Sequence, residues 1–277
     1  MHLTCNEDVV GSSPTRGSKN NVMNDNLDIF ILSYKPFISK VNSNTYKILN
    51  CSSDKIESDL SVYYHNDGDN IASLNGFYSE LTGIYWLWKN YDIKDYIGVC
   101  HYRRYWEFYD EIPNIDELLK EHDIILPKPH KFASSIQKQY SSCHNIDDLN
   151  LVGEIINDLY PEYSSAYNNC LKAKYFFACN LFIMKKDDFN RYCEFVFGVL
   201  NEFLIRKGFT SMKDIFNYVE DNKSLYLKKS YPCNEVWYQS RIGGFLAERL
   251  LNIFVMKNFE RVKSIGIVIT ENKYGKK

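Results

Sequence analysis

Residues 67–106 read DGDNIASLNGFYSELTGIYWLWKNYDIKDYIGVCHYRRYW, and this stretch decides how the rest of the chain is interpreted. Apolar side chains recur every three or four residues in its first half, which predicts a helix with Asn75 as the N-cap and Asn90 at the end. The run YIGVC at 96–100 is typical of a buried strand in a parallel sheet. A polar loop, a helix and a strand therefore precede the basic and aromatic segment HYRRY at 101–105.

The segment HYRRY follows the carboxyl end of this strand, which is the edge where open α/β sheets bind ligands. Guanidinium groups bind phosphate oxygens in pairs, so Arg103 and Arg104 are expected to meet an anion there, together with His101. Side chains alternate along an extended chain, which would send the two arginines to opposite sides. One would then bind phosphate, and the other would pair with a carboxylate such as Glu80.

The composition is that of an ordinary globular protein. The chain has 277 residues, 45% hydrophobic and 25% charged, which allows a large core in one or two domains. Its 33 basic and 35 acidic residues give a net charge of -2, so any attraction for phosphate must be local and nucleic acid is not expected as a partner. No run approaches the ~18 apolar residues that a membrane-spanning helix needs.

The cysteines show neither a CxxC pair nor the spacing of zinc ligands. Several lie in apolar runs, where a free thiol behaves as a small hydrophobic group. With no secretory leader ahead of the first strand, the sequence predicts free, inert cysteines in a reducing cytoplasm. The eight are Cys5, Cys51, Cys100, Cys143, Cys170, Cys179, Cys193 and Cys233.

The N-terminal segment is predicted to lie outside the fold. Residues 1–26 contain the polar tract GSSPTRGSKNN, which cannot bury enough apolar area to become ordered. This segment is interpreted as disordered or as an upstream extension, with Met23 as a plausible start. A single domain is predicted over 27–268, followed by a polar tail at 269–277.

The run LDIFIL at 27–32 predicts the first strand of the sheet, because Pro36 prevents a longer central strand. In nucleotide-binding α/β folds the loop after the first strand commonly meets the base or ribose. Ser33, Tyr34 and Lys35 provide donors at that place. An ordinary strand end explains them equally well.

Carboxylates near the first helix allow two interpretations each. Asp67 and Asp69 have the spacing of a hard-cation site, but they precede a helix instead of following a buried strand, which favours turn formation and capping. Glu80 falls one position off the apolar stripe. It is either half buried near the end of the following strand or a solvated helix carboxylate.

After residue 106 strands and helices alternate, as in a wound α/β sheet. The predicted elements are a helix at 115–122, a strand at 123–126, a helix at 147–159, a core strand at 175–184, a packing helix at 188–204, a final helix at 236–254 and a possible edge strand in SIGIVIT. Residues 207–234 are predicted to be a polar surface excursion.

Polar residues in these later elements are candidates for a site. Gln139, Tyr140 and His144 are placed in a loop before the 147–159 helix, and a loop histidine is usually a surface residue. Asn180 interrupts the most apolar run of the chain, so it either anchors backbone or binds sugar hydroxyls.

The final helix carries charges among apolar residues. Arg241 and Glu248 are seven residues apart and share one face of the predicted helix. Arg249 follows Glu248 directly and therefore points to a neighbouring position around the helix axis. They are interpreted as site residues, although an internal ion pair also explains them.

Cleavage of a sugar–nucleotide bond develops negative charge on the diphosphate, and the site must stabilise that charge. Many GT-A-type glycosyltransferases use a metal ion held by a DxD motif after a buried strand. Here that place holds His101, Arg103 and Arg104 and no carboxylate. The basic side chains are therefore expected to replace the metal, with no cofactor.

These segments together resemble the capsular and exopolysaccharide-biosynthesis glycosyltransferases, a family first known as a domain of unknown function that includes bacterial galactofuranosyltransferases. The resemblance covers about residues 27–257 and rests on HYRRY after DYIG, the GDNI and YSELTGIYWLWKN segments, QY with a later His and DL, NLFIM, and GFLAERLL. One departure is Ser33-Tyr34-Lys35, where the family usually has Thr-His-Lys. This difference bears on the donor-base contacts.

The resemblance implies a GT-A-like nucleotide-diphospho-sugar fold, with a mostly parallel central sheet flanked by helices. It also implies a UDP-linked donor such as UDP-galactofuranose and a glycan acceptor that is often lipid-linked. The positions that match the family's motifs are Asn70, Glu80, His101, Arg103, Arg104, Asn180, Arg241, Glu248 and Arg249.

The expected activity is inverting transfer of a hexosyl unit from a UDP-sugar to a capsule, O-antigen or exopolysaccharide acceptor, in the cytoplasm or at the inner face of the inner membrane. Glu248, Glu80 and Asp69 are the candidate bases. The expected donor contacts are His101, Arg103, Arg104, Ser33, Tyr34, Lys35 and Asn70, and the expected sugar or acceptor contacts are Asn180, Arg241, Arg249 and His144.

Two alternatives stay open. A non-catalytic glycan-binding module would use the faces of the 22 Tyr, 17 Phe and 4 Trp side chains. A metal-dependent nucleotidyl or phosphoryl transferase would use Asp67 and Asp69.

Overall fold

The computed structural model describes residues 24–227 and 229–270, which form an α/β fold around one large sheet. The strands of the sheet are β1 (Leu27–Ser33), β2 (Tyr46–Asn50), β3 (Val62–Tyr64), β4 (Tyr96–His101), β5 (Arg104–Trp106), β6 (Ile124–Pro127), β9 (Phe182–Lys185), β10 (Val262–Ile265) and β11 (Ile267–Ile269). Their order is β10-β6-β9-β4-β1-β2-β3, with β5 beside β4 and β11 beside β5. A separate pair joins β7 (His130–Lys131) to β8 (Tyr175–Phe176).

The sheet brings several chain segments to one edge. Strands β3, β2, β1 and β4 are parallel, so their carboxyl ends lie together. Strand β9 is antiparallel to β4 and β6, so its amino end lies at this same edge. In register, Leu32 is beside His101 and Val99 is beside Phe182. The mostly parallel sheet predicted from the sequence is therefore confirmed, with β9 as an antiparallel exception inside it.

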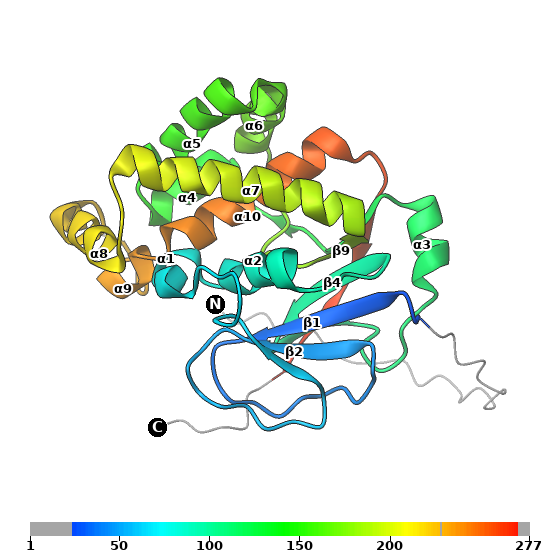
Figure 1. Cartoon of the computed structure of the whole chain (residues 1–277). Coiled ribbons are helices and arrows are strands. Elements are labelled where there is room, and N and C mark those ends of the chain that lie inside the picture. Colours follow the sequence, from blue (N-terminus) through cyan, green and yellow to red (C-terminus); the bar gives the residue numbers. More distant parts are fainter. Residues whose placement is uncertain (1–23, 228, 271–277) are drawn as a thin grey trace, which may run out of the picture.

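Helices cover one face of the sheet (Figure 1). They are α1 (Asn75–Tyr78), α2 (Leu81–Asn90), α4 (Ile136–Cys143), α5 (Ile146–Leu159), α6 (Ser164–Lys172), α7 (Lys186–Lys207), α8 (Met212–Asp221), α9 (Val236–Gln239) and α10 (Ile242–Asn258), and α3 (Ile115–Glu121) lies apart from them. Phe30 and Leu32 of β1 enter the core beneath these helices. Ile29 and Ile31 point to the opposite face, where α3 and the loop after β1 form a second core.

The apolar pattern of α7 and the glycine after it explain where this long helix runs and where it ends. Its apolar side chains recur at helical spacing and are buried against the sheet and the other helices. Gly208 ends it in the left-handed conformation, with φ 68°, which suits glycine at this position. The predicted 188–204 helix is confirmed and is longer at both ends.

The helix predicted across the quoted stretch is interrupted. The prediction that Asn75 is an N-cap is wrong, because Asn75 is the first residue of α1 and Leu74 precedes it without a side-chain cap. Ser79 takes φ 52° and ψ -127°, which separates α1 from α2. Thr82 Oγ and Asn75 Nδ2 both donate to the Ser79 carbonyl, at 3.0 and 3.2 Å. These bonds replace the helical ones, and Asn90 ends α2 as predicted.

The core strand predicted over 175–184 is also interrupted. It divides into β8 and β9, and Cys179 and Asn180 between them take φ 71° and 50°. Periodicity did not reveal this break, because the side chains on both sides of it are apolar. The break turns the backbone N–H of Cys179 and the amide of Asn180 toward α10 and α2.

Other boundaries differ from prediction. Residues 139–143 belong to α4 and not to a loop, and the predicted final helix is split into α9 and α10 around Arg241. Residues 207–234 include α8. Asn24 and Asn26 hydrogen-bond to residues 113–116, so this part of the predicted N-terminal extension is attached to the fold. The predictions for 1–23 and 271–277 lie outside the described residues.

Two glycines allow α10 to approach the α1–α2 break. A Cβ added to Gly243 would lie 2.4 Å from the ring of Phe77, which is fully buried. A Cβ added to Gly244 would lie 3.2 Å from Ser79 Oγ. This close approach places the first turn of α10 beside Ser79.

We expect Gly243→Ala to lower the free energy of unfolding by about 1–2 kcal/mol. The steric cost of overpacking, about 1–3 kcal/mol, exceeds the gain of about 1 kcal/mol in helix propensity, because the enclosed Phe77 ring cannot move away. Urea unfolding measures the change. Asn201→Ala, at an exposed position of α7, is the control and should alter stability by less than about 0.5 kcal/mol. A stabilised Gly243→Ala protein would contradict the close packing.

Candidate active site

A cavity of about 780 Å³ opens at the sheet edge where β1 and β4 end. This volume lies within the range of small-molecule sites. The cavity brings together residues that are far apart in sequence. The predicted site residues that line it are Tyr34, Glu80, His101, Arg103, Arg104, His144, Arg241, Glu248 and Arg249.

Glu80 is held at the centre of this group. Its side chain is 7% exposed, and each carboxylate oxygen has a donor. Asn180 Nδ2 donates to Oε1 at 2.9 Å, and Tyr34 Oη donates to Oε2 at 3.0 Å. The Arg241 guanidinium lies 3.9 Å from Oε2. Of the two interpretations left open for Glu80, the buried one is therefore correct.

Arg241 joins the start of α10 to the α1–α2 break. Its Nε donates to Ser79 Oγ at 2.8 Å, while its terminal nitrogen faces Glu80. The side chain is still 36% exposed, so it can also contact a ligand in the cavity. Arg241 thus fixes the position of Glu80 and remains available on its cavity side.

Glu248 is the second carboxylate of the cavity. Its Oε1 accepts the Cys179 backbone N–H at 2.8 Å, and its Oε2 accepts from Arg249 at 2.9 Å. Desolvation by burial raises the pKa of this carboxyl, and the charge of Arg249 opposes that rise. Its side chain remains 19% exposed, so the carboxylate faces the cavity with fewer donors around it than Glu80 has.

Arg249 is almost completely buried, with a side chain 3% exposed. It donates to the Phe245 carbonyl and, at 2.7 Å, to Gln139 Oε1. The ring of Phe176 lies 4.6 Å from its guanidinium carbon. These contacts occupy most of its donors, so Arg249 orients Glu248 and is not a free anion-binding group.

The segment HYRRY forms a tight β4–β5 turn, in which His101 pairs with Arg104. Because of this turn, Arg103 and Arg104 both line the cavity, and the prediction that they point to opposite sides is wrong. The prediction that one of them pairs with Glu80 is also wrong, because Arg241 takes that place. Within residues 24–227 and 229–270, neither Arg103 nor Arg104 has a carboxylate within 4.0 Å.

His101 does not contribute positive charge. Its pKa is lowered to about 4, chiefly by burial; the charge of Glu80 opposes this shift, and the neighbouring arginines add to it. The imidazole is therefore neutral at pH 7. Its Nε2 is buried without a hydrogen-bond partner among the described residues, so it can exchange a hydrogen bond with a ligand but cannot neutralise one.

Five predicted site residues do not line the cavity. Asn180 is fully buried, and its side-chain amide hydrogen-bonds to Glu80, so it orients that carboxylate and does not line the cavity itself. Ser33 is buried and donates to the Lys35 carbonyl, and the Lys35 ammonium lies 5.8 Å from the Tyr102 ring centre. Asp69 and Asn70 are exposed in the loop before α1.

The loop at 66–70 is held by its own turn bonds. Asp69 accepts from Tyr85 Oη at 3.2 Å, and Asn70 donates to the carbonyls of Asn66 and Gly68. These bonds agree with turn formation. Among residues 24–227 and 229–270, no group of three or more His, Cys, Asp or Glu side chains is arranged to hold a metal ion.

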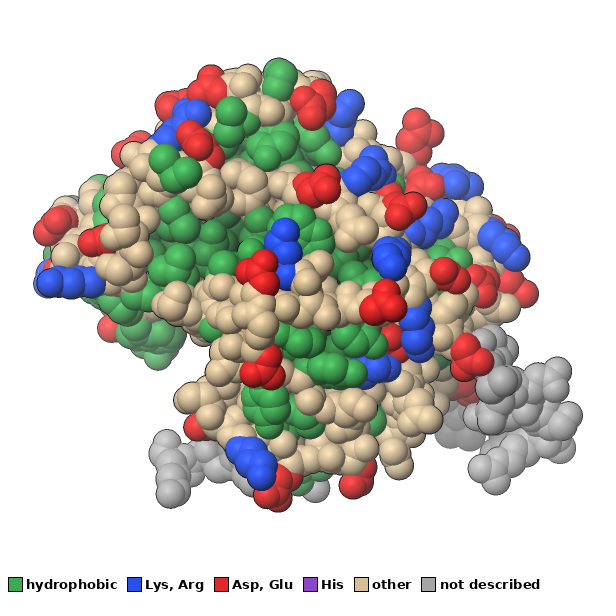
Figure 2. Space-filling view, in the orientation of Figure 1, with side chains coloured by type: hydrophobic (Ala, Val, Ile, Leu, Met, Phe, Trp, Pro, Cys, Tyr) green, Lys and Arg blue, Asp and Glu red, His purple; other side chains and the backbone are tan. Residues whose placement is uncertain are grey.

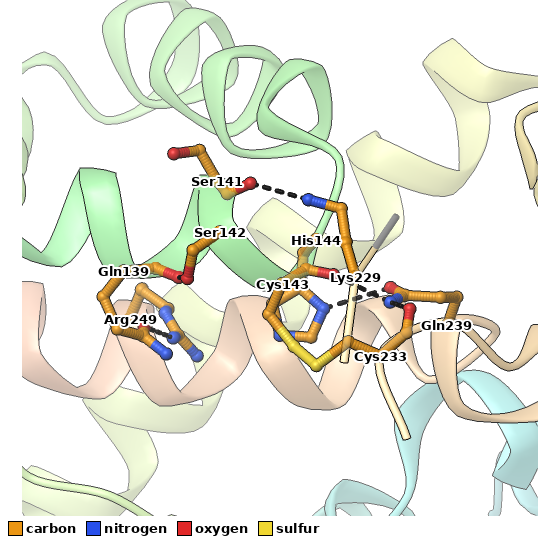
Figure 3. The surroundings of a disulfide bond; sticks show 9 residues. All are labelled: Gln139, Ser141, Ser142, Cys143, His144, Lys229, Cys233, Gln239 and Arg249. Carbon is orange, nitrogen blue, oxygen red and sulfur yellow. Dashed lines mark hydrogen bonds between the residues drawn. A yellow bond between two sulfur atoms is a disulfide. The ribbon is translucent and has the colours of Figure 1, made fainter. Parts of the chain in front are cut away.

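The prediction that every cysteine is free is wrong. Cys143 at the end of α4 forms a disulfide with Cys233, with a Cα–Cα distance of 5.4 Å (Figure 3). Sequence spacing gave no sign of it, since 90 residues separate the two. The described cysteines that remain free are Cys51, Cys100, Cys170, Cys179 and Cys193, most of them buried as predicted.

His144 lies beside this disulfide and is not a surface histidine. It is 6% exposed, its Nδ1 contacts Gln239 Oε1 at 3.1 Å, and its ring stacks on Phe245 at 4.0 Å between centroids. Burial lowers its pKa to about 3, so it is neutral at pH 7. His144 therefore supports the wall of the cavity.

Sequence reasoning missed an aromatic wall of the cavity. Phe216, Trp237, Tyr238 and Phe245 come from α8, α9 and α10 and line it together. The segment VWYQSRIGGF could have indicated three of these residues, Trp237, Tyr238 and Phe245, because it places aromatic residues on both sides of a predicted site arginine.

No helix in the described part of the chain has both the length and the apolar character needed to cross a bilayer.

Two comparisons find similar proteins. The sequence profile of a family described as a domain of unknown function, DUF4422, matches residues 28–221. The chain is also similar to the apo structure of WbbM, a bifunctional glycosyltransferase, with a TM-score of 0.68 and 26% identity. That match covers 89% of this chain and 45% of WbbM, so the chain spans less than half of WbbM's length. No curated protein matches.

Together these matches confirm the resemblance that the sequence motifs indicated, and they confirm a GT-A-like fold. The matched family region contains β1, the α1–α2 break and the HYRRY turn. Residues 222–270, which carry Trp237, Arg241 and Glu248, lie outside that region.

We expect reduction of the Cys143–Cys233 disulfide to lower the free energy of unfolding by about 2–4 kcal/mol, since the cross-link closes a long loop in the unfolded chain. Urea unfolding with and without dithiothreitol measures this. The Cys143→Ser/Cys233→Ser protein is the control, and dithiothreitol should not change its stability. A non-reducing peptide map that finds both thiols free in the oxidised protein would contradict the assignment.

Proposed function

The chain belongs to the DUF4422 family, and from the arrangement of its cavity we propose that it is a glycosyltransferase acting on a nucleotide-diphosphate sugar and a glycan acceptor. The observation that carries this proposal is the combination in one cavity of a partly desolvated Glu248 with Arg103 and Arg104, which have no carboxylate partner among the residues that the structure describes. A leaving diphosphate needs positive charge, which the two arginines would provide. An acceptor hydroxyl needs a base, which Glu248 would provide.

The two arginines are proposed to bind the diphosphate and stabilise the charge that develops on it. Guanidinium groups bind phosphate oxygens through paired hydrogen bonds, and a cavity partly shielded from water strengthens that attraction. The neutral imidazole of His101 adds a hydrogen bond without charge. In this proposal no divalent metal is needed.

Glu248 is proposed as the general base. Asp69 is exposed outside the cavity, and Glu80 is almost buried by Tyr34, Asn180 and Arg241. Glu248 keeps an exposed edge, and its raised pKa makes it a better proton acceptor than an ordinary glutamate. One base and a separate leaving-group site agree with an inverting displacement, which we propose as the stereochemical course.

The finer assignments rest on the family resemblance. We propose a UDP-linked donor, with galactofuranose as the first sugar to test, and an acceptor of the capsule, O-antigen or exopolysaccharide type. The proposed location, the cytoplasm or the inner face of the inner membrane, rests on this resemblance alone, because the Cys143–Cys233 disulfide removes the argument from free cysteines. Tyr34 lines the cavity directly after β1, at the place expected for contact with the nucleotide.

We expect Arg103→Ala and Arg104→Ala each to lower kcat for sugar transfer by about 10²–10³-fold, the effect of removing one group that stabilises a developing anion. Transfer from a panel of UDP-sugars, with product release of UDP as the readout, measures this. Lys35→Ala is the matched control, because Lys35 is a nearby cation outside the cavity lining, and it should stay within about threefold of the unaltered protein.

The same assay in EDTA separates this proposal from a metal-dependent transferase at Asp67 and Asp69. Activity that persists in EDTA supports stabilisation by arginine. Activity that disappears in EDTA and returns with Mn²⁺ would contradict it. Full glycan binding with no transfer in any variant would favour a glycan-binding module.

We expect the acid limb of the kcat/KM profile to lie at higher pH than the usual glutamate pKa of about 4.3, because burial raises the pKa of Glu248. As the pH falls through that pKa, the carboxylate takes up a proton and stops acting as a base, so activity is lost toward low pH. Glu248→Gln should lower kcat by about 10²–10⁴-fold.

Arg249 provides the internal check on this assignment. Its charge lowers the pKa of Glu248, so Arg249→Gln should move the acid limb to still higher pH, and Arg249→Lys should move it less. Circular dichroism controls for folding of these buried variants. An acid limb that stays in place in Arg249→Gln would assign the titration to another group.

A further inference from the structure

The mouth of the cavity carries exposed aromatic rings. Trp237 is 53% exposed and Phe216 is 42% exposed, yet both line the cavity. Trp106 is fully buried and Trp86 is 7% exposed. A large ring left half exposed at the cavity lacks the burial that stabilises Trp86 and Trp106, which points to a ligand that covers it.

The aromatic rings connect to the proposed reaction centre through a chain of contacts. The ring of Trp237 meets that of Tyr238 edge-on, with centroids 5.8 Å apart. The guanidinium of Arg241 lies 5.9 Å from the Tyr238 ring centre and 3.9 Å from the carboxylate of Glu80. A ligand that starts beside Glu80 and Glu248 and extends outward therefore passes over Arg241 to Trp237.

Helix α9, which carries Trp237 and Tyr238, is fixed to α4 (Figure 3). The disulfide of Cys143 joins α4 to the segment that precedes α9. Gln239 donates to the carbonyls of Cys143 and Cys233 and contacts His144. The rings are therefore held in place before a ligand arrives, which lowers the entropic cost of binding.

The chemistry of this mouth fits a sugar. One face of many pyranose rings consists of C–H groups that stack on the electron-rich face of an aromatic ring, while their hydroxyls need polar partners. Arg241 and Gln139 line the same cavity and provide such partners. We propose that Trp237, assisted by Phe216, forms a subsite for the second sugar of the acceptor, so that the acceptor is an oligosaccharide of at least two residues.

This subsite rests on the proposed function and specifies its acceptor. The charge around it argues against an anionic bilayer as the occupant. Residues 211–240 contain four lysines and four acidic residues, 4 − 4 = 0, whereas segments that bind anionic lipids are rich in lysine and arginine. Figure 2 shows charges of both signs mixed with apolar side chains at the α8–α9 end of the molecule.

The test measures binding, so it does not depend on turnover. Methyl galactoside, methyl glucoside and their matching di- and trisaccharides are titrated against the whole protein, with tryptophan fluorescence and ligand-observed NMR as readouts. We expect at least one oligosaccharide to bind about tenfold more tightly than its monosaccharide and to change the Trp237 fluorescence. Trp237→Ala should abolish this gain, and Trp237→Phe should keep most of it without the fluorescence change.

Three controls make the result decisive. Tyr175→Ala removes an exposed ring outside the cavity lining and should keep the gain. UDP binding, followed by thermal shift, should be equal in Trp237→Ala and the unaltered protein, which shows that the variant is folded. Phosphatidylglycerol–phosphatidylethanolamine vesicles test the alternative occupant.

Three outcomes would overturn the subsite. The first is that no oligosaccharide binds better than its monosaccharide, and the second is that the gain persists in Trp237→Ala. The third is that Trp237→Ala loses vesicle binding and keeps glycan binding, which would assign the rings to a bilayer. Glycan binding without any sugar transfer would refute the proposed function and leave the subsite intact.

Discussion

The buried carboxylate of Glu80 is the interaction on which the site depends. Burying a carboxylate costs several kcal/mol unless its oxygens are paired, and here the donors come from distant segments. Tyr34 follows β1, Asn180 precedes β9 and Arg241 begins α10. The need to satisfy one charge therefore fixes the relative positions of the sheet edge, the α1–α2 break and the last long helix. The cavity exists because these elements meet there.

Backbone strain is concentrated at the same place. In the described part of the chain, the residues other than glycine with positive φ are Ser79, Cys179 and Asn180. Each such residue costs of order 1–3 kcal/mol and persists only where its surroundings hold it. Ser79 precedes Glu80, and the other two present donors to Glu80 and Glu248. The strain thus orients the two carboxylates, which regular helix and strand would have directed elsewhere.

The charges of the cavity are divided by role. Arg241 and Arg249 are committed to Glu80 and Glu248, whereas Arg103 and Arg104 have no carboxylate partner in the described part of the chain. Neutral His101 and His144 add no charge at pH 7. Among the described residues that line the cavity, cations without a carboxylate partner lie at the β4–β5 turn, and the partly exposed Arg241 is a further cation; this local excess is compatible with a net charge of -2 for the chain. In the proposed function the phosphate groups bind at this turn, and the aromatic side chains of α8, α9 and α10 line the same cavity.

The sequence by itself determined the class of fold and many of the charged residues of the site. Periodicity revealed β1, β4 and α7, because their burial follows local apolar patterns, and HYRRY marked the end of a buried strand. Only the tertiary structure decided the breaks at Ser79 and Asn180, the disulfide of Cys143, and the placement of both arginines in one cavity. The physical reason is the sequence separation of the partners. Periodicity reports which face of an element is buried, whereas these features depend on hydrogen bonds and packing between residues up to 162 positions apart.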